Sequence, residues 1–247
     1  MTTTTGPFTS PDRVAAAVPW SPLVVLAEAA ARTAAVSEHV VTVVRGFDRE
    51  SRRRARTVRG HLSSLGVRSV EATPAPDSWP TPDSTGLAVA AVVNVAGAGS
   101  WDAHRIAATL RVPLLTLDEA AGGAAAEVDQ RHWDLIDVRA AEQTDFALSQ
   151  VTLLPEDPER AEVSLTVGGT RHVVRGAQVG AGLKEHELRV RVTSPDIEEE
   201  YLTDEVTIEP VTGGYRLVRD GLPVGELTGP VTLTTVRQGL VVHVVRA

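Results

Sequence analysis

LAVAAVVNVAGAGSWDAHRIAATLRVPLLTL, residues Leu87 to Leu117, is the stretch that decides the fold of this chain. Its opening run, residues 88–95, is almost continuously apolar and rich in Val, which predicts a strand covered on both faces, as in a parallel sheet. A second apolar run, residues 112–117, predicts another strand. The residues between them carry apolar side chains at i, i+3, i+4 and i+7, which predicts a helix. These positions are Ala103, Ile106, Ala107 and Leu110. The stretch therefore predicts one strand–helix–strand unit.

The turn between the first strand and the helix is made of small residues. It reads Ala96, Gly97, Ala98, Gly99 and Ser100, and Ser100 is placed to cap the helix. Such a turn leaves backbone N–H groups open, and the positive end of the helix dipole points at it. Both features favour an anion, so the sequence predicts a phosphate site here.

Composition limits the classes of function. The chain has 247 residues, enough for one large domain or two small ones, and its net charge of −8 argues against nucleic acid as a partner. It has no cysteine, which excludes disulfides and thiolate metal sites. Its histidines show no ligand spacing, so no metal-binding residue is predicted.

The N-terminal residues lack the basic start and apolar core of a signal peptide. Residues 1–12 are rich in Thr and Pro, which predicts a disordered tail. The apolar run at residues 23–26 is far too short to span a membrane. We therefore expect a cytoplasmic protein with no transmembrane segment.

The order of elements changes near residues 138–147. Before this point we expect helices, strands and one Pro-rich loop. The expected helices are residues 11–18, 21–35 (capped by Ser21), 48–65 and 119–127, the further strands are 39–44, 67–72 and 133–138, and the loop is 74–84. After it, short alternating runs such as residues 147–154 are separated by Gly168-Gly169, Gly213-Gly214 and Asp220-Gly221, which are strong hairpin signals. The sequence thus predicts an α/β domain over residues 13–140 and an all-β domain over residues 141–247.

This order resembles the diacylglycerol kinase and NAD kinase superfamily, and three places carry the likeness. Residues 94–115 resemble the family's strand, GGDGT turn, helix and following strand. Residues 182–190 resemble the bacterial lipid-kinase stretch lDDGlLdv, and residues 206–245 resemble the ending that contains a DGE turn. The resemblance implies an N-terminal α/β, Rossmann-like nucleotide-binding domain followed by a C-terminal β-sandwich. It also implies an active site in the cleft between them, and ATP and Mg²⁺ as cofactors. Independently of the resemblance, the Val-rich run at residues 240–245 is expected to be core or a dimer edge, so a homodimer through the β domain is a further expectation.

Departures from the family's motifs fall on the residues that carry the chemistry. Ala98 stands where GGDGT has its acid, and alanine can neither bind a hard cation nor move a proton. Leu222 stands at the Glu of the DGE turn. The paired acids of DDG become Lys184 and Glu185. Losing a general base typically costs ~10²–10⁴ in rate, so these changes predict impaired phosphoryl transfer.

The candidate site residues follow from the motifs and the resemblance. Asp102 and Glu185 are the carboxylates that would have to replace the missing acids, although an Asp in a helix's first turn also simply complements the dipole. Arg45 matches a turn that lies near the phosphates in the family. It begins an arginine-rich segment, residues 45–59, which is otherwise explained as a solvated helix face. The expected cofactor-binding residues are Arg45, Ala96, Gly97, Ala98, Gly99 and Ser100.

Three functions remain open from the sequence. The first is a lipid-kinase-like protein with impaired catalysis that binds a nucleotide, a lipid or a protein partner between its domains. The second is an active lipid kinase that uses ATP and Mg²⁺. The third is a phosphate-ligand-binding module whose glycine turn only mimics GGDGT.

Overall fold

The computed structural model describes residues 20–35, 39–73, 88–97, 101–118, 128–140 and 143–246. The helices are α1 (Trp20–Ala34), α2 (Arg49–Ser64) and α3 (Asp102–Leu110). The first strands are β1 (Val40–Val44), β2 (Ser69–Ala72), β3 (Val89–Asn94), β4 (Leu114–Asp118), β5 (Val128–Ala140), β6 (Gln143–Ala147), β7 (Gln150–Pro155) and β8 (Glu162–Val167). The remaining strands are β9 (Thr170–Arg175), β10 (Gln178–Lys184), β11 (Glu187–Thr193), β12 (Glu198–Thr203), β13 (Glu205–Thr212), β14 (Tyr215–Arg219), β15 (Leu222–Leu227) and β16 (Val231–Arg246).

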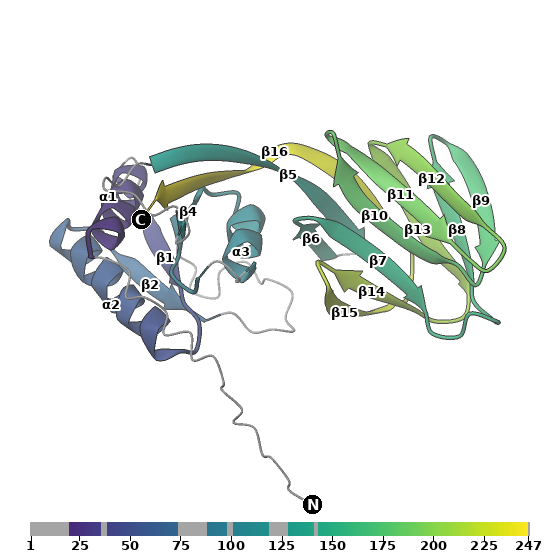
Figure 1. Cartoon of the computed structure of the whole chain (residues 1–247), viewed down its shortest axis with the longest axis horizontal. Helices are drawn as coiled ribbons and strands as arrows, with labels where there is room; N and C mark the ends of the chain where they lie inside the picture. Colours follow the sequence, from purple (N-terminus) through teal and green to yellow (C-terminus); the bar gives the residue numbers. More distant parts are fainter. Residues whose placement is uncertain are drawn as a thin grey trace, which may run out of the picture.

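The N-terminal part is a parallel sheet with helices on both faces, as its apolar runs predict. Its strands lie in the order β2-β1-β3-β4. Side chains of α1 and α2 share one buried cluster with β1 and β3, whereas α3 packs on the opposite face. Figure 1 shows this part with α3 on the side that faces the rest of the chain. Helix α3 therefore lies between this sheet and the rest of the chain.

Helix α2 begins and ends where its sequence predicts. The carboxylate of Asp48 accepts the N–H of Ser51 at 2.7 Å, which caps the first turn. Ala55, Val58 and Leu62 form its fully buried face. After the helix, Gly66 takes a φ of 75°, a conformation that glycine adopts without a Cβ penalty.

The Asp48 cap provides a first prediction. Asp48→Ala is expected to lower the free energy of unfolding by about 1 kcal/mol at neutral pH. Hydrogen bonds from the Ser51 hydroxyl and N–H lower the pKa of Asp48. As the pH falls, the Asp48 carboxyl is therefore protonated in the unfolded state before it is protonated in the folded state. The stabilisation that the cap provides is lost as the pH falls below 3.8, the ordinary pKa of an Asp side chain. Urea unfolding at pH 7 and pH 2.5 measures this, and an equal cost at both pH values would contradict it.

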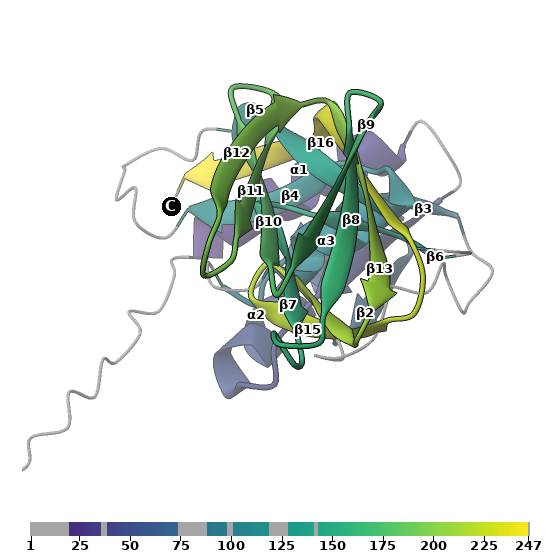
Figure 2. The same cartoon turned by 90° about the vertical axis from the view of Figure 1, so that its right-hand side faces the viewer.

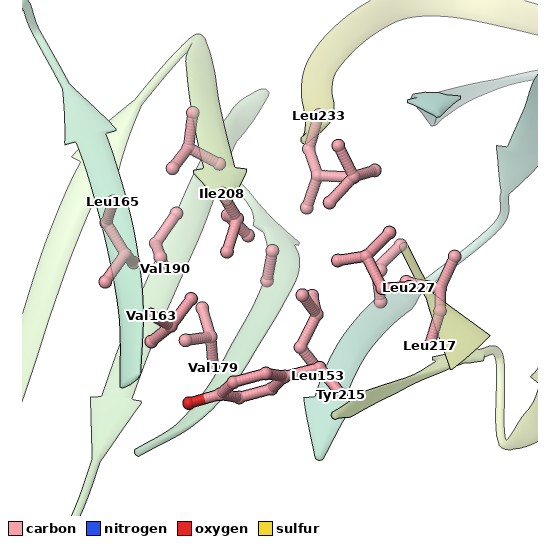
Figure 3. Close-up of a cluster of buried hydrophobic side chains, with 14 of the residues drawn as sticks. Leu153, Val163, Leu165, Val179, Val190, Ile208, Tyr215, Leu217, Leu227 and Leu233 are labelled. Carbon is pink, nitrogen blue, oxygen red and sulfur yellow. The ribbon is translucent and has the colours of Figure 1, made fainter. Parts of the chain in front are cut away.

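The C-terminal part consists of two sheets packed face to face. One is antiparallel, in the order β12-β11-β10-β7-β14-β15. The other contains β9, β8, β13 and the first half of β16, with β5 and β6. Figure 3 shows the core between the sheets, to which Leu153 and Val190 point from one side and Leu165 and Leu233 from the other. The predicted hairpin turns at Gly168-Gly169 and Asp220-Gly221 are present, with positive φ at both glycines of the first and at Gly221. The hairpin predicted at Gly213-Gly214 is wrong, because this turn joins β13 of one sheet to β14 of the other.

Two long strands are shared by both parts. Strand β5 pairs with β16 along nearly its whole length, and the end of β16, residues 242–246, also pairs in parallel with β4. Figure 1 shows this two-stranded ribbon running from the β part to the helices, and Figure 2 shows the β part in front of the α/β part. The last strand thus returns to the α/β part, so a domain boundary at residues 140/141 leaves the two parts joined through one ten-stranded sheet.

Several expected elements differ in the structure. Helix α1 begins at Trp20, so Ser21 is inside it rather than its cap. The strand expected at residues 133–138 is the longer β5, and the single run expected at 147–154 is divided between β6 and β7. The expected tail and short helix before residue 19, the loop at 74–84 and the helix at 119–127 lie outside the described residues. Among the described helices, none has both the length and the apolarity to cross a membrane.

Candidate functional site

The turn after β3 is shaped by the side chain at the end of that strand. Asn94 is buried, and its Oδ1 accepts the N–H of Ala96 at 3.0 Å. Its Nδ2 donates to Thr116 Oγ1 on β4 at 3.5 Å. Gly97 then takes a φ of 102°, and within the described chain no atom lies within 4 Å of the position a Cβ would occupy. None of the described residues therefore fills the space beside Gly97, which lies at the carboxyl end of a buried parallel strand.

The N-terminus of α3 lies just beyond this turn. Trp101 holds the N-cap position and its side chain makes no capping hydrogen bond. Ser100, the expected cap, lies outside the described residues, as do Ala98 and Gly99. Among the described residues, no side-chain cap satisfies the first-turn N–H groups, which is an arrangement that suits a ligand's oxygens.

Asp102 does not stand alone in the first turn of α3. Its carboxylate forms an ion pair with Arg105, whose side chain is buried. Among the described residues, Nη1 of Arg105 has no hydrogen-bond acceptor. The carboxylate of Asp102 would therefore have to leave a buried guanidinium before it could act as a general base.

A second buried ion pair faces α3 from the β part. Arg219 of β14 is 5% exposed and contacts the carboxylate of Asp145 of β6, which is 0% exposed. Burial and the positive charge of Arg105 lower the pKa of Arg219 to about 10, so it remains a cation at neutral pH. Helix α3 also packs against β6, whose Phe146 shares its apolar cluster. The junction between the two parts is thus charged as well as apolar.

Arg45 lies beside the candidate turn but is already engaged. Its guanidinium pairs with Glu71 of β2 and donates to the carbonyl of Gly46 at 2.8 Å. Hydrogen bonding by Arg45, with a smaller effect of Arg59, lowers the pKa of Glu71. A Cβ at Gly46 would lie 3.9 Å from the Cβ of Ala96, so the Arg45 turn and the β3–α3 turn are in contact. The structure therefore brings Gly46 and Ala96 together, whereas the Arg45 guanidinium lies toward Glu71 of β2.

Glu185 lies on a different face of the ribbon. It sits in the β10–β11 turn with a φ of 51°, and it is exposed. The next residue, His186, pairs with Asp134 of β5, which also accepts the N–H of Gln238 at 2.7 Å. The neighbouring Trp133 packs against α3 instead. Because successive side chains of a strand point to opposite faces, the β10–β11 turn and α3 contact opposite faces of β5.

The Asp220-Gly221 turn is held by a carboxylate that is fully used. Asp220, with a φ of 48°, accepts the N–H groups of Leu148 at 2.9 Å, Ser149 at 2.8 Å and Gln150 at 3.1 Å. It also accepts the Ser149 hydroxyl at 2.9 Å. The carboxylate of Asp220, in the β14–β15 turn, therefore holds the neighbouring β6–β7 turn in place.

Sequence reasoning missed the buried charges at the junction. Arg105, Asp145 and Arg219 are not among the predicted site residues, although Arg219 places a charge at an inward position of the alternating strand β14. That position is the signal that could have found the Arg219–Asp145 pair, because buried charges are retained only when paired.

No protein-family model and no curated protein matches the sequence. Two solved structures that resemble it are the NAD kinase of Archaeoglobus fulgidus in complex with ATP and yeast NADH kinase complexed with NADH. The first has 15% identity, covers 82% of this chain and 93% of that chain, and gives a TM-score of 0.49. The second has 10% identity, covers 90% and 80%, and gives a TM-score of 0.42.

At these identities and TM-scores the likeness carries no information on ligand or activity. The ligand and chemistry of this chain have to come from its own residues.

Proposed function

We propose that this chain binds a nucleotide through its phosphates at the β3–α3 turn and is impaired in phosphoryl transfer. The observation that supports binding is the open, left-handed backbone at Gly97, which follows a buried parallel strand and precedes α3. Ligands of open α/β sheets bind outside the carboxyl ends of the strands, and phosphates favour the N-terminus of a helix there.

The impairment is supported by the partners of the carboxylates near this turn. The carboxylate of Asp102 forms an ion pair with Arg105. Both carboxylate oxygens of Asp220 accept N–H groups of the β6–β7 turn. Position 98, where the resemblance places the acid of GGDGT, is alanine. An active lipid kinase would need Asp102 to leave Arg105 at a cost, since a buried cation would then lose its partner.

The residues at the β3–α3 turn suit the phosphates of ATP better than they suit Mg²⁺. Backbone N–H groups near Gly97 and at the start of α3 would hold phosphate oxygens. Mg²⁺, when bound, supplies charge stabilisation for phosphoryl transfer and needs oxygen ligands. Asp102 is the acidic residue of the first turn of α3, and its pairing with Arg105 opposes that use. We therefore propose nucleotide binding that does not depend on Mg²⁺. A lipid ligand and self-association through the β part stay predictions.

The test is thermal unfolding of the chain with and without ATP. At one hundred times its Kd, ATP should add about 2.7 kcal/mol of stability, which raises the Tm by roughly 5–10 °C for a chain of this size. Gly97→Val should abolish this response, because a β-branched residue is strained at positive φ and its side chain would fill the space that phosphate needs.

Gly169→Val is the matched control. Gly169 also has a positive φ, 81°, and open space around it, but it lies in the β8–β9 turn. This variant should be destabilised in the same way and still respond to ATP. An ATP response that survives in Gly97→Val, or that is absent in the unsubstituted chain, would contradict the proposed function.

A further inference from the structure

A groove runs along β10 on the outer face of the six-stranded sheet. Its volume is about 330 Å³, and the residues that line it belong to β7, β10, β11 and the turn before β7. Strand β10 lies between β7 and β11 (Figure 1). Val179 and Ala181 of β10 are buried in the core between the two sheets, so Gly180 and Gly182, which alternate with them, face outward. These two glycines form the floor of this β10 groove.

The backbone does not require glycine at either position. Gly180 and Gly182 lack the positive φ that favours glycine, and a Cβ at Gly180 would meet no described atom within 4 Å. A Cβ at Gly182 would lie 3.5 Å from the carbonyl oxygen of Ser149, an ordinary contact. Glycine weakens the interior of a strand and often marks a place where a ligand approaches the backbone. Two such residues in one strand therefore keep the floor free of side chains at the expense of stability.

The walls of the β10 groove are polar and positively charged. In register across the sheet, Gly180 lies between Thr152 of β7 and Arg191 of β11, and Arg189 lies beside Gly182. Neighbouring strands are about 4.8 Å apart, so β7 and β11 leave a trough about 10 Å wide. The other polar residues that line it are Ser149, Gln150, Gln178 and Thr193. Of the described residues that line the groove, the charged ones are both arginines and none is aromatic.

The positive charge of the two arginines is only partly compensated. Arg189 Nε lies 2.9 Å and Arg191 Nη2 3.4 Å from the same oxygen, Oε2, of Glu200 on β12. Hydrogen bonding by Arg189 lowers the pKa of Glu200, so this carboxylate is ionised at neutral pH. Among the described residues no other carboxylate pairs with either arginine. One negative charge therefore faces two positive charges, and the balance favours an anionic ligand.

The chemistry of the walls defines the rest of the ligand. Guanidinium groups bind carboxylates and phosphates. The amide side chains of glutamine and the hydroxyl groups of threonine and serine both donate and accept hydrogen bonds, as the hydroxyl groups of a sugar do. The volume lies at the low end of the ~300–1,000 Å³ range of small-molecule sites, so the ligand is small. A nucleobase would find no aromatic ring on which to stack among the described residues of the walls.

We propose that the β10 groove binds an anionic sugar, with its carboxylate or phosphate on Arg189 and Arg191 and its ring over Gly180 and Gly182. None of the residues that line the groove belongs to the β3–α3 turn. This inference therefore does not depend on the proposed nucleotide site.

Calorimetric titration with glucuronate, glucose 6-phosphate and glucose tests the proposal. One or both of the anionic sugars should bind at least tenfold more tightly than glucose, and the tighter of the two distinguishes a sugar acid from a sugar phosphate. Arg189→Gln should weaken this binding about 10-fold, because a charge-assisted hydrogen bond is lost. Arg216→Gln is the control, since Arg216 lies exposed on β14 of the same sheet, pairs with Glu156 and does not line the groove. It should leave the affinity unchanged.

Gly180→Val separates ligand binding from stability. The valine side chain should fill the groove and abolish binding of the anionic sugar. The Tm should be unchanged or higher, because valine suits an extended strand better than glycine does. Gly60→Val is the matched control, since Gly60 on α2 also lacks a positive φ and has no described atom within 4 Å of its Cβ position. This variant should bind the sugar as the unsubstituted chain does.

Three results would overturn the proposal. The first is that neither anionic sugar binds more tightly than glucose. The second is an equal loss in Arg189→Gln and Arg216→Gln, which would show attraction by overall charge alone. The third is binding that survives in Gly180→Val. The ATP response is measured separately, so a chain that ignores ATP but binds an anionic sugar would contradict the proposed function and support the β10 groove.

Discussion

Asp145→Ala is expected to lower the free energy of unfolding by about 3–5 kcal/mol, the largest effect of any single substitution considered for this chain. The substitution leaves the guanidinium of Arg219 buried, close to the like charge of Arg105 and without the carboxylate that compensates it. For a chain of this length the Tm should fall by roughly 10 °C. Urea or thermal unfolding followed by circular dichroism measures the change.

Two controls distinguish the buried pair from charge removal in general. Asp204→Ala removes one partner of an exposed pair with Arg237, 3.5 Å apart, and should cost no more than about 1 kcal/mol. The double variant Asp145→Leu/Arg219→Met should recover most of the stability, because no unpaired charge remains buried. If Asp145→Ala cost no more than Asp204→Ala, the buried pair would not hold the junction together.

Asp220→Ala should lower the free energy of unfolding by about 3 kcal/mol. Three backbone N–H groups and one hydroxyl lose their acceptor at the β6–β7 turn. Alanine is also strained at the φ of 48° that Asp220 adopts. Asp220→Asn should cost less, because Asn tolerates this conformation and keeps one acceptor oxygen. Equilibrium urea unfolding of the unsubstituted chain, Asp220→Asn and Asp220→Ala should give free energies of unfolding that decrease in this order.

The same variants examine what the acid of this turn does. If Asp220 acts only on the turn, ATP affinity measured well below the Tm should be unchanged in Asp220→Asn. A loss of ATP affinity with stability unchanged would instead place Asp220 in the ligand site.

The strand–helix–strand unit could be predicted from sequence because its signals are local. Continuous apolar residues specify β3, and the apolar spacing from Ala103 to Leu110 specifies α3. The β5–β16 ribbon could not be predicted. Residues 128–132, Val-Asp-Gln-Arg-His, are mostly polar and exposed, and they form a strand because residues 241–245 of β16 pair with them. Pairing over more than a hundred residues leaves no periodicity to detect.

The location of the candidate site stays a prediction, and the sequence indicates its turn better than the partners of its side chains. Small residues at 96 and 97 indicate the turn, and Gly46, the residue after Arg45, lies against it. The pairing of Asp102 with Arg105 depends on which way the helix faces, and Asp145 meets Arg219 from 74 positions away in sequence. The predicted roles of Asp102 and Glu185 in catalysis stay untested, and those of Ala98, Gly99 and Ser100 lie outside the described residues.

The central claim is that the Gly97 turn holds nucleotide phosphates without the metal-linked chemistry of a kinase. Its most direct test is calorimetric titration of the chain with ATP in Mg²⁺ and in EDTA, with ADP release followed in the same samples. Closely similar Kd values in the two buffers, with no ADP above the protein-free blank, are the predicted result. A Kd at least tenfold lower in Mg²⁺, accompanied by ADP release that Asp102→Ala abolishes, would contradict it.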